Sequence, residues 1–273
     1  MKTPKRLKSG NWDWHDRVCV VTGASSGIGN RLARDLARSG ATVCAVARRS
    51  DRLEELVGEL DPGRHSFVTA DVAERDDVRT LRDHVESTYG RCDVLVNNAG
   101  VAGESDFDGP AALADLERVM AVNFFGAAYC TAELLELLAA SAPSHVVNIA
   151  SVAGKLTWGG ASAYCASKFA LVGWSESLYF ELARKGVHVG VVEPGPVPTE
   201  GFPQRDLKGD PWLRYAMTSD AGVSAAIRRV VERGKMERVV PRWYYLLQVP
   251  RLLVPPVYRF ANRRILSRAG RPT

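Results

Sequence analysis

A tyrosine and a lysine stand one helical turn apart in the stretch YCASK, at Tyr164 and Lys168. In a helix this spacing places both side chains on one face. Tyrosine ordinarily titrates at a pKa of about 10, and an ammonium group beside it is expected to lower that pKa by stabilising the phenolate. Tyr164 could then give a proton to a carbonyl oxygen or take one from an alcohol. Taken alone, the same pair is also typical of an amphipathic surface helix.

A loop with three glycines follows the first predicted strand, in VVTGASSGIG at residues 20–29. Gly23, Gly27 and Gly29 read G-x-x-x-G-x-G, which fits neither the G-x-G-x-x-G fingerprint nor the P-loop. The loop nevertheless joins a strand to a helix, where unpaired backbone N–H groups and the helix dipole attract phosphate. Glycine also lets the backbone approach such a group closely. We expect a pyrophosphate here, and the alternative is a plain glycine-rich turn.

The second predicted strand ends in Ala47-Arg48-Arg49, without an acidic side chain. A protein selective for NAD usually carries an acidic residue at this point to hold the ribose hydroxyls. Arginine instead suits a ribose 2′-phosphate, because its planar fork binds phosphate oxygens in pairs. The sequence therefore favours NADP(H) over NAD(H). A solvated strand end is the alternative explanation of the two arginines.

Short β-rich runs alternate with helical periodicity from residue 17 onward. The strand runs are nearly continuous in Val, Ile and Ala, as in a parallel sheet that helices cover on both faces. This alternation indicates a doubly wound α/β fold, here a Rossmann-like, three-layer α/β/α single domain with a C-terminal extension. We predict strands at 17–23, 41–48, 65–72, 92–100, 144–151, 187–195 and 237–241, and helices at 30–40, 51–60, 76–90, 113–138, 164–186 and 221–234.

Composition and charge narrow the function classes. Of the 273 residues, 46% are hydrophobic and 25% are charged, which suits an ordinary globular domain. The net charge of +5 is uneven, because residues 1–17 carry +3 and residues 241–273 carry +7. Positive charge confined to the chain ends argues against a nucleic-acid-binding domain. We expect neither a secretory signal nor a membrane span, since no suitable apolar run is evident. The five scattered cysteines indicate reduced packing residues rather than disulfides or a metal site.

Five motifs in this order resemble the short-chain dehydrogenase/reductase family: TGASSGIG at 22–29, NNAG at 97–100, Asn123 in AVNFFGAAY, Ser151 in NIASVAG, and YCASK at 164–168. The resemblance covers roughly residues 17–200. It implies an NAD(P)-dependent oxidoreductase that interconverts a carbonyl and an alcohol by hydride transfer. The chain then divides into a basic N-terminal segment (1–16), a catalytic domain (17–240) and a basic, aromatic C-terminal extension (241–273).

The resemblance also implies a role for each matching residue. Tyr164 is the expected general acid/base, and Lys168 also holds the nicotinamide ribose. Ser151 is expected to bond the substrate oxygen, and Asn123 to hold a water that links Lys168 to solvent. Asp71 is expected to contact the adenine, or else to cap the following helix. The full cofactor-binding set is Gly23, Ser25, Ser26, Gly27, Ile28, Gly29, Arg48, Arg49, Asp71, Val72, Asn98, Ala99, Gly100, Tyr164, Lys168, Pro194, Gly195, Val197 and Thr199.

One departure and one extension accompany the resemblance. Ser26 stands where many NADP-using members carry a basic residue. In the extension, Pro250, Pro255 and Pro256 rule out one continuous helix. Arginines beside Trp and Tyr suit peripheral contact with an anionic membrane. The alternative is that the extension packs on its own domain or on a neighbouring subunit.

The substrate loop is expected between Thr199 and Ser219. Its aromatic residues, together with the apolar extension, favour a lipid-, retinoid- or steroid-like alcohol or ketone. A ketone linked to an acidic carrier protein is an alternative, and so is a cofactor-sensing protein of the same fold without turnover. We expect a cytoplasmic homodimer or homotetramer that acts on a small molecule and has no nucleic-acid partner.

Overall fold

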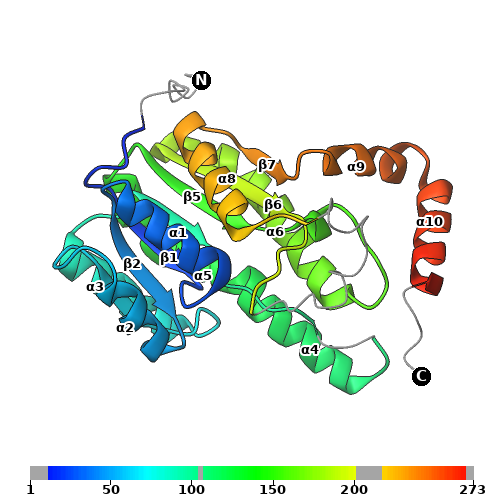
Figure 1. Cartoon of the computed structure of the whole chain (residues 1–273), viewed down its shortest axis with the longest axis horizontal. Helices are drawn as coiled ribbons and strands as arrows, with labels where there is room; N and C mark the ends of the chain where they lie inside the picture. Colours follow the sequence, from blue (N-terminus) through cyan, green and yellow to red (C-terminus); the bar gives the residue numbers. More distant parts are fainter. Residues whose placement is uncertain (1–11, 104–106, 201–216, 269–273) are drawn as a thin grey trace.

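The computed structural model describes residues 12–103, 107–200 and 217–268. At its centre lies a seven-stranded sheet in the order β3-β2-β1-β4-β5-β6-β7, with every neighbouring pair parallel (Figure 1). The strand order reverses between β1 and β4, which is the switch point where such sheets bind ligands. The predicted doubly wound α/β fold and its final edge strand are confirmed. The strands are β1 (Val18–Thr22), β2 (Thr42–Ala47), β3 (Ser66–Thr69), β4 (Val94–Asn97), β5 (Ser144–Ile149), β6 (Val187–Pro194) and β7 (Glu237–Val240).

Helices cover both faces of the sheet and bury its nearly continuous apolar strands. One core lies between the sheet and α1 (Gly27–Arg38), α2 (Ser50–Gly58) and α8 (Asp220–Arg233). The second core lies on the other face, under α3 (Arg75–Tyr89), α5 (Gly126–Ala140) and α6 (Ser162–Leu182). The two faces together form the expected three layers. Buried leucines such as Leu32 and Leu134 fill these cores, and each such side chain stabilises the fold by roughly 1.5–3 kcal/mol.

The longest helical run has three parts. α4 (Pro110–Met120) passes into a π-helical turn (Ala121–Phe125) and then into α5. By length and composition the run Pro110–Ala140 could cross a membrane, so the expectation that no apolar run is long enough is wrong. The apolar side chains of α5, including Leu134 and Leu138, are however buried against the sheet. We therefore assign this run to the core of the domain.

The two ends of the described chain differ in how they pack. Trp14 is buried in the first core, and its indole N–H donates to Glu232 at 2.9 Å. At the other end, α9 (Tyr244–Leu253) and α10 (Pro255–Arg268) extend beyond β7 at the edge of the sheet (Figure 1). The predicted interruption of the extension lies at Val254, between the two helices. Pro250, in contrast, lies inside α9.

Candidate active site

A cavity of about 830 Å³ opens at the carboxyl ends of the parallel strands. It collects the segments that follow β1, β2, β3, β4, β5 and β6, as expected for a ligand site at the switch point. Most of the predicted residues line it, whereas Gly29 and Asn123 lie behind its wall. The lining residues from the predicted set are Gly23, Ser25, Ser26, Gly27, Ile28, Arg48, Arg49, Asp71, Val72, Asn98, Ala99, Gly100, Ser151, Tyr164, Lys168, Pro194, Gly195, Val197 and Thr199.

The glycine loop needs its glycines for close backbone packing. Gly23 has a φ of +67°, and a Cβ there would lie 2.9 Å from the Cα of Ala99. A Cβ on Gly29 would lie only 2.4 Å from the carbonyl oxygen of Gly23. Helix α1 begins at Gly27, earlier than the predicted residue 30, so its first turn forms part of the loop. The bare backbone and the helix N-terminus together form a cradle that fits a dinucleotide pyrophosphate.

Asn98 connects this loop to the strand beside it. Its side-chain Nδ2 donates to the carbonyl oxygens of Thr22 (2.9 Å) and Gly23 (3.3 Å). In return, the hydroxyl of Thr22 accepts from the backbone N–H groups of Asn98 (3.0 Å) and Ala99 (3.1 Å). Asn98 therefore fixes the shape of the cradle as well as lining the cavity.

The two arginines after β2 flank the glycine loop. Arg49 donates to the hydroxyls of Ser25 (3.1 Å) and Ser26 (3.0 Å), and it pairs with Glu200 at 3.1 Å. Arg48 lies 3.4 Å from a carboxylate oxygen of Asp71. Guanidinium groups and serine hydroxyls thus converge where a ribose 2′-phosphate could bind. The residues present fit a dinucleotide cofactor.

The carboxylate of Asp71 does not cap helix α3, because the N-cap position of that helix is Glu74. Its Oδ1 instead accepts from the backbone N–H of Ala73 at 3.0 Å. Asp71 and Val72 line the cavity next to β3, so the adenine contact stays a prediction while the capping alternative is wrong.

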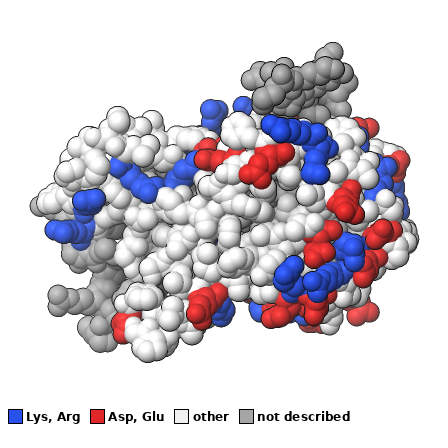
Figure 2. All heavy atoms as spheres, turned by 180° about the vertical axis from the view of Figure 1, so that it is seen from behind, with Lys and Arg blue, Asp and Glu red and all other residues white. Residues whose placement is uncertain are grey.

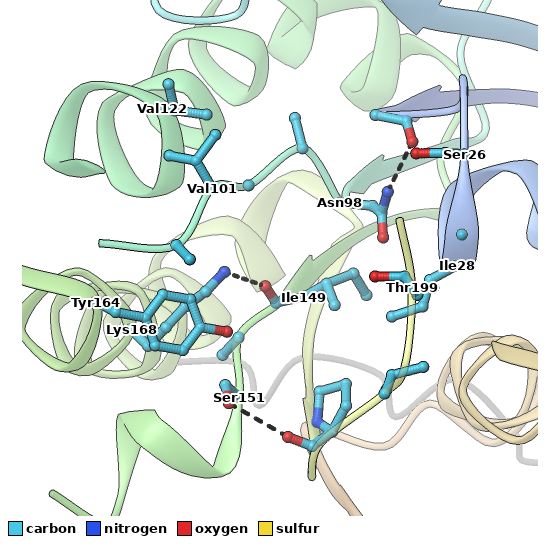
Figure 3. A pocket seen from close by; sticks show the side chains of 18 of the residues that line it. Ser26, Ile28, Asn98, Val101, Val122, Ile149, Ser151, Tyr164, Lys168 and Thr199 are labelled. Carbon is cyan, nitrogen blue, oxygen red and sulfur yellow. Dashed lines mark hydrogen bonds between the residues drawn. The ribbon is translucent and has the colours of Figure 1, made fainter. Parts of the chain in front are cut away.

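Three polar side chains gather at the opposite end of the cavity. Tyr164 and Lys168 project from α6 toward Ser151, which follows β5 (Figure 3). The ammonium of Lys168 donates to the carbonyl oxygen of Ile149 at 2.9 Å. Ser151 donates to the carbonyl oxygen of Pro194 at 3.3 Å, and it also shares a hydrogen bond with Tyr164. A substrate oxygen placed here would meet two hydroxyl groups beside a buried cation.

The pKa values of this group differ from the expectation. Burial raises the pKa of Tyr164 to about 12, against the hydrogen bond with Ser151, which lowers it. Burial also lowers the pKa of Lys168 to about 8. The ammonium lies 5.7 Å from the centre of the Tyr164 ring, and burial, which disfavours the phenolate, is the largest cause of the raised Tyr164 pKa. The expectation of a lowered Tyr164 pKa is therefore wrong for the chain without bound cofactor or substrate. Tyr164 is a neutral phenol at neutral pH.

Asn123 is buried in the π-helical turn and does not line the cavity. Its Oδ1 accepts from the N–H of Val101 at 2.8 Å. Its Nδ2 donates to the carbonyl oxygen of Val101 and to the hydroxyl of Ser167, both at 3.0 Å. A Cβ on Gly100 would lie 3.2 Å from Asn123 Oδ1 and 3.6 Å from Lys168 Nζ, so both side chains rest against this glycine. Asn123 thus positions the segment after β4, and its water-holding role stays a prediction.

Pro194, Gly195, Val197 and Thr199 form the wall that faces the glycine loop. A Cβ on Gly27 would lie 2.9 Å from the Cγ2 atom of Thr199, which shows how closely the two segments approach. Val197 lines the cavity, and its expected part in cofactor binding stays a prediction. Most of the expected substrate loop, residues 201–216, lies outside the described residues.

Sequence reasoning missed three cavity residues with large polar or aromatic side chains, Arg118, Trp158 and Glu200. Arg118 on α4 donates to the carbonyl oxygen of Ala102 at 3.0 Å, and nothing in its helical pattern marks it as functional. Trp158 lies in the loop KLTWGG, and 41% of its surface is exposed. A single tryptophan beside two glycines is a sequence signal from which this residue could have been predicted.

Comparisons with known proteins agree with this geometry. The family model for short chain dehydrogenase matches residues 17–208. Farnesol dehydrogenase of Aedes aegypti is 33% identical over 253 residues, which cover 89% of this chain and 97% of that protein. The 11-beta-hydroxysteroid dehydrogenase 1A of Arabidopsis thaliana is 32% identical over 264 residues, or 91% of this chain and 75% of that protein.

Solved structures with the same fold hold either cofactor. The Pseudomonas aeruginosa RhlG/NADP active-site complex has a TM-score of 0.72 and 29% identity, covering 82% of this chain and 94% of that one. A short chain dehydrogenase/reductase from Burkholderia phymatum in complex with NAD has a TM-score of 0.74 and 25% identity, covering 96% and 98%. With the family match, the parallel sheet and the Ser151–Tyr164–Lys168 group in one cavity, the chain belongs to the short-chain dehydrogenase/reductase family and is an NAD(P)-dependent oxidoreductase.

Proposed function

We propose that the protein reduces the carbonyl group of an apolar, lipid-, retinoid- or steroid-like compound with NADPH, and that it catalyses the reverse oxidation when the alcohol is in excess. The observation that carries this proposal is the group of Ser151, Tyr164 and Lys168 in the same cavity as Arg48 and Arg49. Bound nicotinamide would supply the hydride.

The proton comes from the chain's own residues. With a pKa raised to about 12, Tyr164 keeps its proton at neutral pH and can donate it to the carbonyl oxygen of the substrate. The hydroxyl of Ser151 can bond the same oxygen and stabilise the charge that develops on it. Lys168, with a pKa of about 8, is mainly charged at pH 7 and favours the phenolate that remains on Tyr164.

The preference for NADPH rests on charge at the other end of the cavity. Two guanidinium groups and two serine hydroxyls converge beside the end of β2. The nearest carboxylates, Asp71 and Glu200, are paired with Arg48 and Arg49. The negative charge of a ribose 2′-phosphate would attract the two guanidinium groups. Each guanidinium can donate two parallel hydrogen bonds to phosphate oxygens.

The apolar substrate is supported by the lining near Tyr164. Val101, Ala102, Val152, Trp158 and Ala161 line the same cavity as the polar group of Ser151, Tyr164 and Lys168 and add apolar surface to it. Two relatives named above act, by their names, on farnesol and on a hydroxysteroid. Both names describe apolar alcohols, which this lining would also accept.

A panel of carbonyl compounds tests the proposal. Purified protein is incubated with NADPH and either long-chain, isoprenoid and steroid ketones and aldehydes or small polar ones, and loss of NADPH absorbance is followed. We expect turnover of the apolar set and at most weak turnover of the polar set. Turnover confined to polar sugars or short hydroxy acids would overturn the substrate class, and NADPH binding without turnover of any member would favour a cofactor-sensing protein.

The proposal includes a homodimer or homotetramer in the cytoplasm. The exposed phenyl rings of Phe125 and Phe180 support contact between copies. The mass in solution, measured by light scattering, tests the assembly, and a monomer would exclude it. Fractionation of the cells that make the protein tests the location.

A further inference from the structure

Helices α9 and α10 expose an unusual number of large apolar side chains. Tyr244 is the single buried residue of α9. Leu252 and Leu253 are 73% and 76% exposed, which leaves almost all of their apolar surface in water. Water-exposed apolar surface of this extent marks a site that contacts another apolar phase. The exposed apolar residues of the two helices and of the residue between them are Tyr245, Leu246, Leu247, Val249, Leu252, Leu253, Val254, Val257 and Phe260.

The same two helices bear only positive charge. Residues 241–273 contain seven arginines and no Asp or Glu. A second cavity, of about 550 Å³, lies between α10 and the loop 157–159, and Arg251, Arg259 and Arg263 line it. Seen from behind, the end of the molecule that carries these helices shows white and blue surface, whereas acidic side chains gather mainly toward the opposite end (Figure 2). Three guanidinium groups around one hollow suit a phosphate.

This arginine-lined cavity adjoins the active site. Trp158 lines both cavities. The hydroxyl of Tyr258 accepts from the backbone N–H of Thr157 at 2.7 Å and donates to its carbonyl oxygen at 2.8 Å, and Asn262 donates to the same oxygen at 3.0 Å. Arg251 bonds the carbonyl oxygen of Lys155. The helix pair is therefore fixed to the loop that carries Trp158, a residue that lines the catalytic cavity.

We propose that α9 and α10 form a docking surface for an anionic phospholipid bilayer. The exposed leucines and valines enter the boundary between headgroups and acyl chains, while the cavity lined by Arg251, Arg259 and Arg263 takes a headgroup phosphate. Because Trp158 lines both cavities, docking of the helix pair brings the active-site cavity close to the membrane. An apolar substrate dissolved in the bilayer would be delivered directly, a consequence that rests on the proposed function, whereas the docking itself does not.

Charge decides between a bilayer and a second copy of this chain. A symmetric contact between two copies would bring one acid-free surface against an identical one, so that like charges repel without compensation. An anionic membrane instead attracts each arginine near its surface and accepts the exposed apolar side chains at the same time. An anionic bilayer therefore accounts for both the arginines and the exposed apolar side chains of the helix pair.

Vesicle co-sedimentation of the full chain tests the docking without any need for turnover. Phosphatidylcholine vesicles with and without phosphatidylserine are compared, at low and at high salt. We expect binding to the mixed vesicles that weakens as salt rises, and much weaker binding to phosphatidylcholine alone. Absence of binding to the mixed vesicles at low salt would overturn the proposal.

Two variants and one matched control locate the surface. Arg259→Ser with Arg263→Ser should weaken partitioning onto mixed vesicles roughly thirtyfold, or about 2 kcal/mol, at about 1 kcal/mol for each basic residue. Leu252→Ser with Leu253→Ser should weaken it at least about tenfold at both salt concentrations. The control, Arg79→Ser with Arg82→Ser on α3, removes the same charge from the far end of the molecule and should change binding less than about threefold.

Titration with NADPH in the absence of lipid shows that each variant is folded, and unchanged affinity is expected for all three. Equal losses for the α10 and α3 pairs would mean that net charge alone attracts the protein, and would overturn the docking surface. A smaller mass in solution for the leucine variant, without vesicle binding by the wild type, would assign these helices to contact between copies instead. Failure of turnover with intact vesicle binding would count against the proposed function alone.

Discussion

Replacing Arg48 and Arg49 together with alanine should abolish the preference for NADPH. A charge-assisted contact with phosphate is worth about 1.5–3 kcal/mol when it is shielded from solvent. The side chains of Arg48 and Arg49 are 65% and 42% exposed, so solvent screening reduces this figure. At about 1 kcal/mol each, the double variant loses about 2 kcal/mol, or roughly thirtyfold in the Kd for NADPH. Affinity for NADH, which has no 2′-phosphate, should stay within about threefold.

Titration of both cofactors by protein fluorescence or calorimetry measures these constants. Arg52→Ala is the matched control, because Arg52 lies on α2, is 47% exposed and pairs with the same Glu200, yet does not line the cavity. It should leave both Kd values unchanged. Equal affinity of the wild type for NADPH and NADH, or equal losses of both in the double variant, would refute the reasoning.

Two further changes probe the glycine loop and a buried histidine pair. Gly29→Ala places a methyl group 2.4 Å from a carbonyl oxygen, so it should weaken NADPH binding and lower the free energy of unfolding by about 1–3 kcal/mol. The control is Gly173→Ala in α6, where the new methyl group meets nothing within 4 Å. This control should raise the free energy of unfolding by up to about 1 kcal/mol. Equal effects in urea unfolding would contradict this. Burial lowers the pKa of His145 and His188 below 6.5, so both remain neutral in the fold while the unfolded chain gains protons. The stability that neutral histidines contribute should be fully present above about pH 6.5. Below that pH the free energy of unfolding should fall by up to about 1.4 kcal/mol per pH unit for each histidine. The double variant His145→Gln with His188→Gln should flatten this slope, and an unchanged slope would contradict the prediction.

The layered fold could be predicted because its signals are local. Most strands are short apolar runs bounded by polar or glycine residues, and β7 (Glu237–Val240) lies within the predicted run 237–241. The boundaries were less accurate: β4 is Val94–Asn97 rather than 92–100, since burial and pairing decide where a strand ends. The π-helical turn at Ala121–Phe125 gave no signal, because its sequence continues the helical pattern on both sides.

The candidate site could be predicted from motif order, but its electrostatics could not. The cavity brings Ser151, Tyr164 and Lys168 together as the spacing indicated. The raised pKa of Tyr164 depends on how deeply the phenol is buried, which no spacing reveals. Asn123 was assigned a direct role because its position in the order is right, yet its amide is bonded behind the wall. Trp158 lies in a loop whose preceding residue, Thr157, is bonded to Tyr258 on a helix a hundred residues away in sequence.

The measurement that tests the central claim most directly is the turnover of Tyr164→Phe with NADPH and a carbonyl compound that the wild type reduces. The substitution keeps the ring and removes the proton that the raised pKa holds in place. We predict that kcat falls by about a hundredfold or more, while the Kd for NADPH changes less than about threefold. Near-normal kcat in Tyr164→Phe, with the same alcohol as product, would contradict the account.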